Sequence, residues 1–164
     1  MKKACLFWIG LSLIAQGWAN PLDSIKPLLL DLPGWQAKPA EGFNSYHDPI
    51  KMINASRRYT RGNQSIDAVL FLTNQVEETG WLDSNLNFES AGSSIITETI
   101  DGFQIFRANR KYKNEVVIIV VIQRKENEGA FLALSYKNIS VEEALKLAKQ
   151  FDWNDMEFII SSIN

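Results

Sequence analysis

Seven consecutive apolar residues, VVIIVVI from Val116 to Ile122, constrain the fold more than any other stretch of the chain. The run is too short to span a membrane, which needs about 20 apolar residues in a helix. Its β-branched residues favour an extended backbone. The pattern therefore predicts a central strand over residues 115–124 with both faces covered, one of them by a helix over residues 141–151.

Further strands are predicted on either side of this run. Alternating polar and apolar side chains indicate paired strands, and the stretch IDAVLFL is apolar on both faces, as inside a sheet. Asp101-Gly102 is typical of a two-residue hairpin, because both turn positions need positive φ. The predicted strands lie at residues 54–61, 65–73, 95–100, 103–111, 115–124 and 130–137.

A helix is predicted at each end of the strand region. Residues 20–34 form a short N-terminal helix capped by Ser24. Residues 35–48 follow as a loop without a clear period, with an extended piece at Trp35–Lys38 as the alternative for its start. At the other end, Ser140 and Glu143 form a capping box, in which each side chain bonds the backbone N–H of the other residue. A short turn or helix near the C-terminus follows this second helix.

The order of these elements defines the predicted fold class. It is an α+β domain with a single, mainly antiparallel sheet of about five or six strands, flanked by an N-terminal and a C-terminal helix. One region, residues 74–94, has no clear period. Long unpatterned loops in compact domains are usually functional, or they contain an unrecognised helix. We therefore expect this segment to form the functional surface.

Residues 1–19 have the composition of a bacterial secretory signal. Two lysines precede an apolar core, and Gly17 and Ala19 place small residues at the positions that a signal peptidase recognises. The alternative is a membrane anchor that stays attached, but the apolar run is shorter than a membrane span. The predicted mature domain therefore comprises residues 20–164, in the periplasm or secreted.

Cleavage after Ala19 changes the charge and removes the only cysteine. The full chain has 17 basic and 19 acidic residues, and loss of two lysines leaves a net charge of −4. A negative charge argues against a nucleic-acid partner. Without Cys5, the mature domain has no disulfide, thiol nucleophile or thiolate metal site. Its stability must come from its core.

Four stretches resemble a group of small secreted bacterial proteins of unknown function. They are LPGW at Leu32–Trp35, ASRRYTRG at Ala55–Gly62, IDGFQIFR at Ile100–Arg107 and ALKLAKQFDW at Ala144–Trp153. The similarity covers nearly all of the chain after residue 19. The order of elements also resembles the Mog1/PsbP-type α/β/α sandwich. Neither resemblance implies a catalytic residue or an activity.

His47 is the only histidine and lies in the stretch FNSYHDPIK. A hydrolase triad needs a base that contacts a nucleophile and is oriented by an acid. Ser45 and Asp48 are near in sequence, but neighbours on an extended loop point in different directions. A surface turn is therefore favoured over a catalytic cluster or a metal ligand, and no G-x-S-x-G elbow occurs.

Acidic residues gather in the long unpatterned segment, at Glu77, Glu78, Asp83 and Glu89. Carboxylates support general acid–base catalysis or calcium binding, but the spacing of a calcium loop is missing. A solvated acidic loop is the favoured interpretation. No glycine-rich phosphate loop occurs either, so we predict no metal and no cofactor.

Arg57 and Arg61 share one face of a predicted strand with Tyr59, while Arg58 points to the other face. Arginine side chains bind carboxylates and phosphates through two parallel hydrogen bonds. If a neighbouring strand placed Arg107 alongside, the sheet would carry an arginine–aromatic patch. The alternative is that these arginines pair with acidic residues on neighbouring strands.

Trp35, Trp81 and Phe88 lie in predicted loops, where exposed aromatic side chains bind ligands or partners. The alternative is that they close the edges of the core. The candidate residues for ligand or partner binding are therefore Trp81, Phe88, Arg57, Arg61, Tyr59 and Trp35.

These features favour a non-enzymatic periplasmic or secreted domain that binds a protein partner or an envelope component. The alternative is a module for a small apolar or anionic ligand, and a hydrolase is less favoured. No membrane span is expected after cleavage of the signal. A closed apolar cavity on the order of several hundred Å³ would favour a ligand, whereas a flat aromatic patch would favour a partner.

Overall fold

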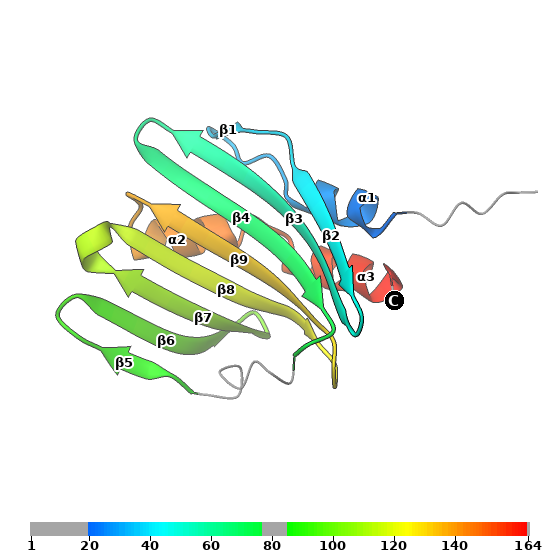
Figure 1. Cartoon of the computed structure of the whole chain (residues 1–164). Coiled ribbons are helices and arrows are strands. Elements are labelled where there is room, and N and C mark those ends of the chain that lie inside the picture. Colours follow the sequence, from blue (N-terminus) through cyan, green and yellow to red (C-terminus); the bar gives the residue numbers. More distant parts are fainter. Residues whose placement is uncertain (1–19, 77–84, 164) are drawn as a thin grey trace, which may run out of the picture.

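One large sheet dominates the architecture (Figure 1). The computed structural model describes residues 20–76 and 85–163. Within them, nine strands form an antiparallel sheet in the order β1-β3-β4-β9-β8-β7-β6-β5, and β2 pairs with the same edge of β3 as β1. The strands are β1 Gln36–Ala37, β2 Glu41–His47, β3 Ile50–Arg61, β4 Gln64–Thr73, β5 Asn87–Glu89, β6 Ser93–Ile100, β7 Phe103–Arg110, β8 Glu115–Arg124 and β9 Gly129–Lys137.

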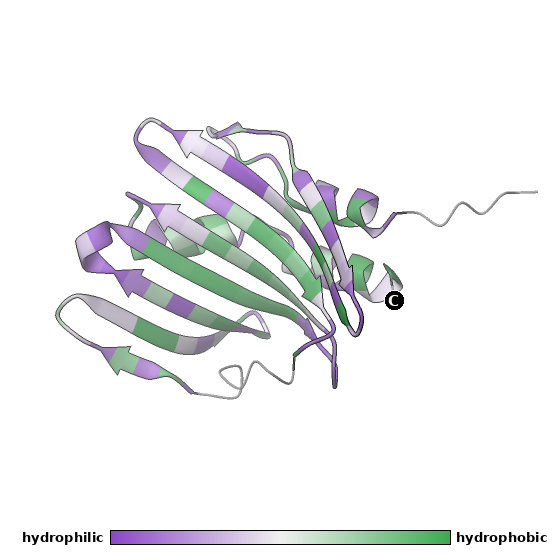
Figure 2. Ribbon diagram, viewed as in Figure 1, coloured by the Kyte–Doolittle hydropathy of each residue, from purple (hydrophilic) through white to green (hydrophobic). Residues whose placement is uncertain are grey.

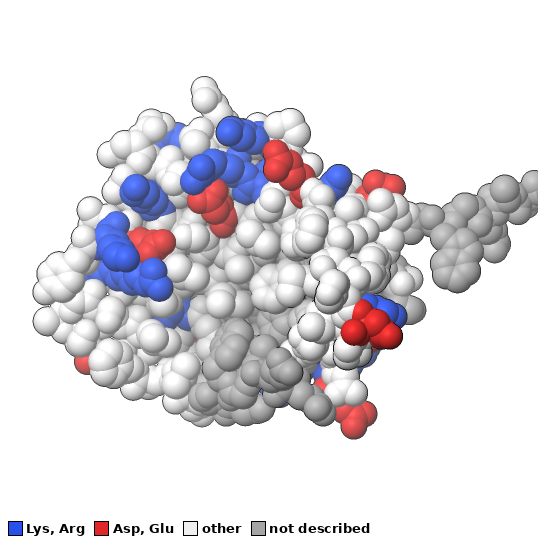
Figure 3. Space-filling model, viewed as in Figure 1, with Lys and Arg blue, Asp and Glu red and all other residues white. Residues whose placement is uncertain are grey.

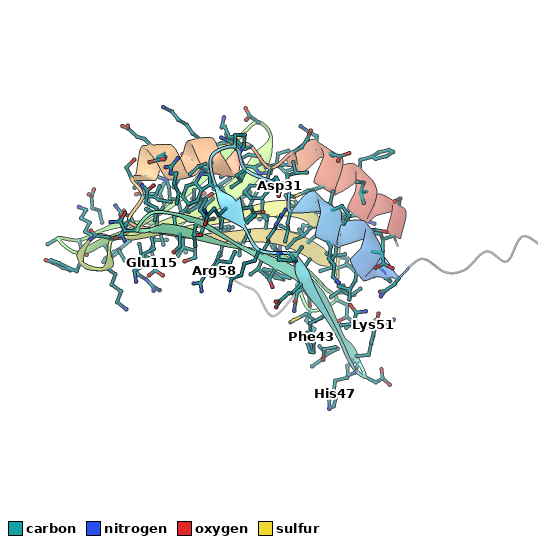
Figure 4. All side chains as sticks on the ribbon, turned by 90° about the horizontal axis from the view of Figure 1, so that it is seen from above. Asp31, Phe43, His47, Lys51, Arg58 and Glu115 are labelled. Atoms are coloured by element: carbon teal, nitrogen blue, oxygen red, sulfur yellow. The ribbon has the colours of Figure 1, made fainter. Side chains whose placement is uncertain are left out.

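The described α-helices all lie on one face of this sheet, behind it in the view of Figure 1. They are α1 Pro21–Ile25, α2 Val141–Ala148 and α3 Trp153–Ile163, with 3-10 turns at Lys26–Leu28 and Lys111–Lys113. Figure 4, turned by 90°, shows the helices above the sheet and the end of the β2–β3 hairpin projecting away from them. No helix of the described chain covers the second face, which we call the open face.

The predicted fold class is wrong in the extent of the sheet and in the position of the helices. Instead of five or six strands flanked by helices, the described chain has nine strands, and its short helices share one face. The prediction missed the edge strands β2 and β5, whereas β1 lies within the extended piece predicted at Trp35–Lys38. Sequence analysis places residues 35–48 in a loop, yet Gln36 pairs with Thr60 and Glu41 with Ser56. Solvent-exposed edge strands lack the apolar alternation that reveals a half-buried strand.

The core lies between the sheet and the helices. Side chains alternate along each strand, and the register aligns Ala68, Leu134 and Ile118 on three neighbouring strands, where all are completely buried. Phe151 packs edge-on against Tyr59, with ring centroids 6.1 Å apart. The helical segments and the residues that follow them cover this face with Ile25, Leu28, Leu29, Ala144, Leu147, Phe151, Trp153, Met156 and Ile160.

Several local predictions are confirmed, with one correction. The VVIIVVI run lies in β8, inside the sheet and beneath the helices, but in the described chain only one of its faces is covered by helices. Asp101 and Gly102 have φ values of 52° and 89°, as a two-residue hairpin requires. The hydroxyl of Ser140 accepts a hydrogen bond from the N–H of Glu143 at 3.2 Å. Glu143 itself directs its carboxylate to Arg61.

The two terminal helices differ from their predicted bounds. Asn20, not Ser24, caps α1, and its side-chain oxygen accepts a hydrogen bond from the N–H of Leu22 at 3.2 Å. The α-helix then gives way to a 3-10 turn around Pro27, because proline lacks the N–H that would continue the α-helical bonding. At the C-terminus, α3 extends over 11 residues where a short turn or helix is predicted.

Candidate functional site

The open face carries a strip of apolar side chains across the middle of the sheet. Phe71 of β4 lies directly opposite Phe131 of β9, and their rings stack with centroids 5.0 Å apart. Phe131 also lies opposite Val121 of β8. These residues belong to a second hydrophobic cluster, separate from the core under the helices. Its members, which we call the open-face strip, are the buried residues Val76, Phe106, Val121 and Phe131, with the partly buried Phe71 and Ile119 packed against them.

Exposed aromatic residues flank the strip at both ends of the sheet. Phe43 of β2 is 57% exposed, and Phe88 of β5 is 56% exposed. Phe43 lies opposite Asn54, which lies opposite Phe71, so the three share one face. Phe88 lies opposite Ile95, at the other edge of the open face. Figure 4 shows Phe43 on the part of the hairpin that points away from the helices.

Two ion pairs border the strip. Arg58 of β3 pairs with Asp67 of β4 at 2.8 Å, and Arg110 of β7 pairs with Glu115 of β8 at 3.1 Å. Figure 3 shows the charged atoms of this face mainly along its upper and left parts and at its right end, with an area of other residues between them. Figure 2 shows apolar stretches of ribbon along the central strands. Exposed aromatic side chains bordered by polar groups are the pattern of protein interfaces.

The predicted arginine–aromatic patch lies on the opposite face, where Arg57 has a structural role. Its Nε donates to the carbonyl oxygen of Lys38 at 2.8 Å, and its Nη1 donates to that of Leu29 at 2.7 Å. Its Nη2 donates to Asp31 at 2.5 Å. The guanidinium also lies 5.4 Å from the centre of the Tyr59 ring. These bonds hold the segment around β1 against β3.

Arg61, Trp35 and Tyr59 are engaged in the same region. Arg61 bonds Gln64 through Nε at 2.9 Å and Glu143 through Nη2. Its guanidinium lies 4.4 Å from the centre of the Trp35 ring, and that ring is buried. Tyr59 is completely buried, and this burial raises its pKa to about 12. The structure therefore brings these candidates together, but as a support for the core and not as an open binding patch.

The remaining candidates are dispersed. Arg107 lies on β7, with three strands between it and β3, and pairs with Glu98 at 3.0 Å. It does not join the other arginines. Among the predicted binding residues that the structure describes, only Phe88 is exposed on the open face. Trp81 lies outside the described residues, as do Glu77, Glu78 and Asp83.

His47 ends β2 and is exposed. Figure 4 shows it at the tip of the projecting hairpin. Tyr46 and His47 point to opposite faces of the strand, because side chains alternate, so the neighbours in sequence do not form a cluster. In the part of the chain that the structure describes, no group of three or more His, Cys, Asp or Glu residues is placed to hold a metal ion.

Sequence analysis missed Phe43, Phe71, Phe106 and Phe131 as candidate site residues. The apolar run in β4 indicates a strand whose two faces both avoid water, and the prediction assigned a cover to each. Phe43 lies in a segment predicted to be a loop. A strand pattern alone does not distinguish an apolar face covered by the same chain from one that is left for a partner.

Comparisons with known proteins identify no relative of this chain. No family model, curated protein or solved structure matches the chain. None of the helices within the described ranges combines the length and apolar character needed to cross a membrane. The resemblance to small secreted bacterial proteins stays a prediction, and the geometry of the open face is the main evidence on function.

Proposed function

We propose that the protein is a non-enzymatic binding domain of the periplasm or the extracellular space, and that its open face takes up an apolar surface of a partner protein. One observation carries the proposal. The open-face strip is flanked by two exposed phenylalanines, Phe43 and Phe88, at opposite ends of a nine-stranded sheet. Large apolar side chains that stay exposed on one face of a soluble protein commonly mark an interaction site.

The rim charges favour an apolar partner over a charged one. Arg58 and Arg110 are each paired with a carboxylate on a neighbouring strand. Paired charges produce little net field, so they do not attract a phosphate or a carboxylate to this face. The exposed phenylalanines then supply affinity, and the paired charges keep the free surface hydrated and orient the partner.

The two phenylalanines are the expected anchors of the interaction. Full burial of a Phe side chain contributes about 1.5–3 kcal/mol, and both residues are more than half exposed. Interface energy is concentrated in such aromatic residues. Phe71 and Ile119 lie half-buried between them. This broad surface suits a macromolecule better than a small ligand, whose sites are concave.

The test compares the two faces of the molecule with matched substitutions. The partner is isolated from the envelope of the source organism, and its affinity for each variant is measured by calorimetry. Phe88→Ser and Phe43→Ser should each weaken binding by about 2 kcal/mol, roughly 30-fold. The control is Phe158→Ser, which removes a phenylalanine that is 75% exposed on α3, on the other face. It should leave the affinity unchanged.

Melting temperatures verify that the variants fold, which is expected because all three side chains are exposed. Two results would overturn the proposal. One is full affinity in the Phe43→Ser/Phe88→Ser double variant. The other is an equal loss of affinity in the Phe158→Ser control.

A further inference from the structure

A cleft of about 710 Å³ lies on the helix-covered side, at the end of the sheet where β3 begins and β4 ends. Ile53, Leu72 and Ala130 line it from β3, β4 and β9, and the register places these three side by side. Ser24 of α1 and Ile160 of α3 line it from the helices. This volume falls in the range of small-molecule sites, about 300–1,000 Å³.

A row of polar side chains borders this apolar floor. Lys51, Asn74 and Glu128 each stand two residues from Ile53, Leu72 and Ala130 respectively. Lys51 lies on β3, where residues two apart point to the same face, whereas Asn74 follows the end of β4 and Glu128 precedes the start of β9. The row therefore lies beside the floor, at the end of the sheet. Tyr46 of β2 lies opposite Lys51 and extends the row. All four polar residues line the cleft.

Lys51 and Glu128 are the charged members of the row, and neither forms an ion pair with a residue that the structure describes. Asn74 lies between them, and its side-chain amide already forms two hydrogen bonds within the protein. It accepts from the N–H of Lys51 at 2.7 Å and donates to the carbonyl oxygen of Pro49 at 2.6 Å. The backbones of Lys51 and Glu128 lie two strand spacings apart, about 10 Å. A cation and an anion thus stand at the mouth of the cleft without neutralising each other.

We propose that this cleft binds a single-chain amphiphile with a zwitterionic head group, of the lysophosphatidylethanolamine class. The acyl chain lies over Ile53, Leu72 and Ala130. The phosphate of the head group accepts hydrogen bonds from the ammonium of Lys51 and the hydroxyl of Tyr46. The ammonium of the head group donates to the carboxylate of Glu128.

Electrostatics favours a zwitterion over the simpler amphiphiles. A fatty acid satisfies Lys51 but brings its carboxylate toward Glu128. An uncharged glyceride partly removes both side chains from water without pairing either. A zwitterion forms charge-assisted hydrogen bonds with both residues. The two charges at the mouth therefore select the head group, while the apolar floor selects the chain.

This site is independent of the proposed partner surface. The cleft is lined by side chains on the helix-covered side, whereas the open-face strip lies on the other side of the sheet. Substitutions in the cleft should therefore leave partner binding unchanged, and substitutions of Phe43 and Phe88 should leave amphiphile binding unchanged.

The test titrates the purified protein with three probes that share one acyl chain, each below its micelle concentration. They are palmitoyl lysophosphatidylethanolamine, palmitate and monopalmitoylglycerol. The zwitterion should bind at least about tenfold more tightly than the other two. Lys51→Met and Glu128→Gln should each weaken its binding about tenfold, because each removes one charge-assisted bond. Glu128→Gln should not weaken the binding of palmitate.

Matched controls locate the site. Lys38→Met and Glu142→Gln change exposed charges outside the cleft and should have no effect. Ser24→Phe should weaken the binding of all three probes, because the larger side chain fills the cleft from α1. Equal affinity for the zwitterion and the glyceride would overturn the proposal, as would tighter binding of palmitate. Unchanged zwitterion binding in both charge variants, with unchanged melting temperatures, would also refute it.

Discussion

Ile118 and Ile119 are consecutive residues of β8 that face opposite environments. Ile118 points toward the helices and is completely buried, whereas Ile119 lies on the open face and is only partly buried. The pair therefore reports the difference between the two faces of the sheet at one position in the fold.

Ile118→Ala should destabilise the protein by about 2–5 kcal/mol, because it leaves a cavity in the core. Ile119→Ala should cost only about 1 kcal/mol, since part of its side chain is already in contact with water. Urea denaturation of both variants measures the difference. If both variants lost the same free energy of unfolding, the side chain of Ile119 would be as well covered as that of Ile118, and this result would contradict the difference between the two faces.

Arg57 and Arg58 provide a second matched pair, in β3. Arg57→Met should cost about 2 kcal/mol, because it removes hydrogen bonds to the carbonyl oxygens of Leu29 and Lys38 from a side chain that is 16% exposed. Arg58→Met removes only an exposed pair with Asp67, which contributes about 0–1 kcal/mol. Thermal unfolding of the two variants tests the structural role of Arg57. A smaller loss for Arg57→Met than for Arg58→Met would contradict that role.

Tyr59 and Tyr136 are both completely buried, but their hydroxyl groups differ. Tyr59 donates to the carbonyl oxygen of Leu30 at 2.8 Å, whereas the hydroxyl of Tyr136 has no partner among the described residues. Tyr59→Phe should therefore cost about 1 kcal/mol, and Tyr136→Phe should be neutral or stabilising. Denaturant midpoints of both variants check this, and a larger loss for Tyr136→Phe would reveal an unrecognised partner.

The same two tyrosines predict a loss of stability at high pH. Burial raises the pKa of Tyr59 to about 12 and raises the pKa of Tyr136 as well. The unfolded chain, with a tyrosine pKa of about 10, releases these protons more readily than the folded protein. Their contribution to stability is therefore complete below pH about 10 and is lost as the pH rises through the folded pKa.

Urea denaturation from neutral pH to pH about 11 measures this decline. The free energy of unfolding should fall less steeply above pH about 10 in the Tyr59→Phe/Tyr136→Phe double variant than in the unaltered protein. An identical decline in both proteins would show that other groups cause the alkaline loss.

Sequence patterns were sufficient where burial is dictated by neighbouring residues in the chain. The β-branched run of β8 has no stable place except inside a sheet, and Asp101-Gly102 suits a single type of hairpin. The capping serine of α2 also acts within its own first turn. In each case the physical cause lies within a few residues of the element.

The same patterns failed where burial depends on distant segments. Arg57 is held by carbonyl groups about twenty to thirty residues earlier in the chain, and nothing near it in sequence marks it as structural. Phe43 belongs to an edge strand whose exposed residues do not alternate. The cover of the second sheet face was inferred from apolarity alone, although apolarity equally suits a face that a partner protects.

The central claim is that a partner protein binds the open face, and site-specific photo-crosslinking tests it most directly. A photoreactive phenylalanine analogue is placed at Phe43, Phe88 or Phe158 in the protein produced by its source organism. Our account predicts that positions 43 and 88 yield an adduct with the same second protein, and that position 158 yields none. An adduct from position 158 alone, a cross-link only to a second copy of this chain, or no adduct from positions 43 and 88 would contradict the account.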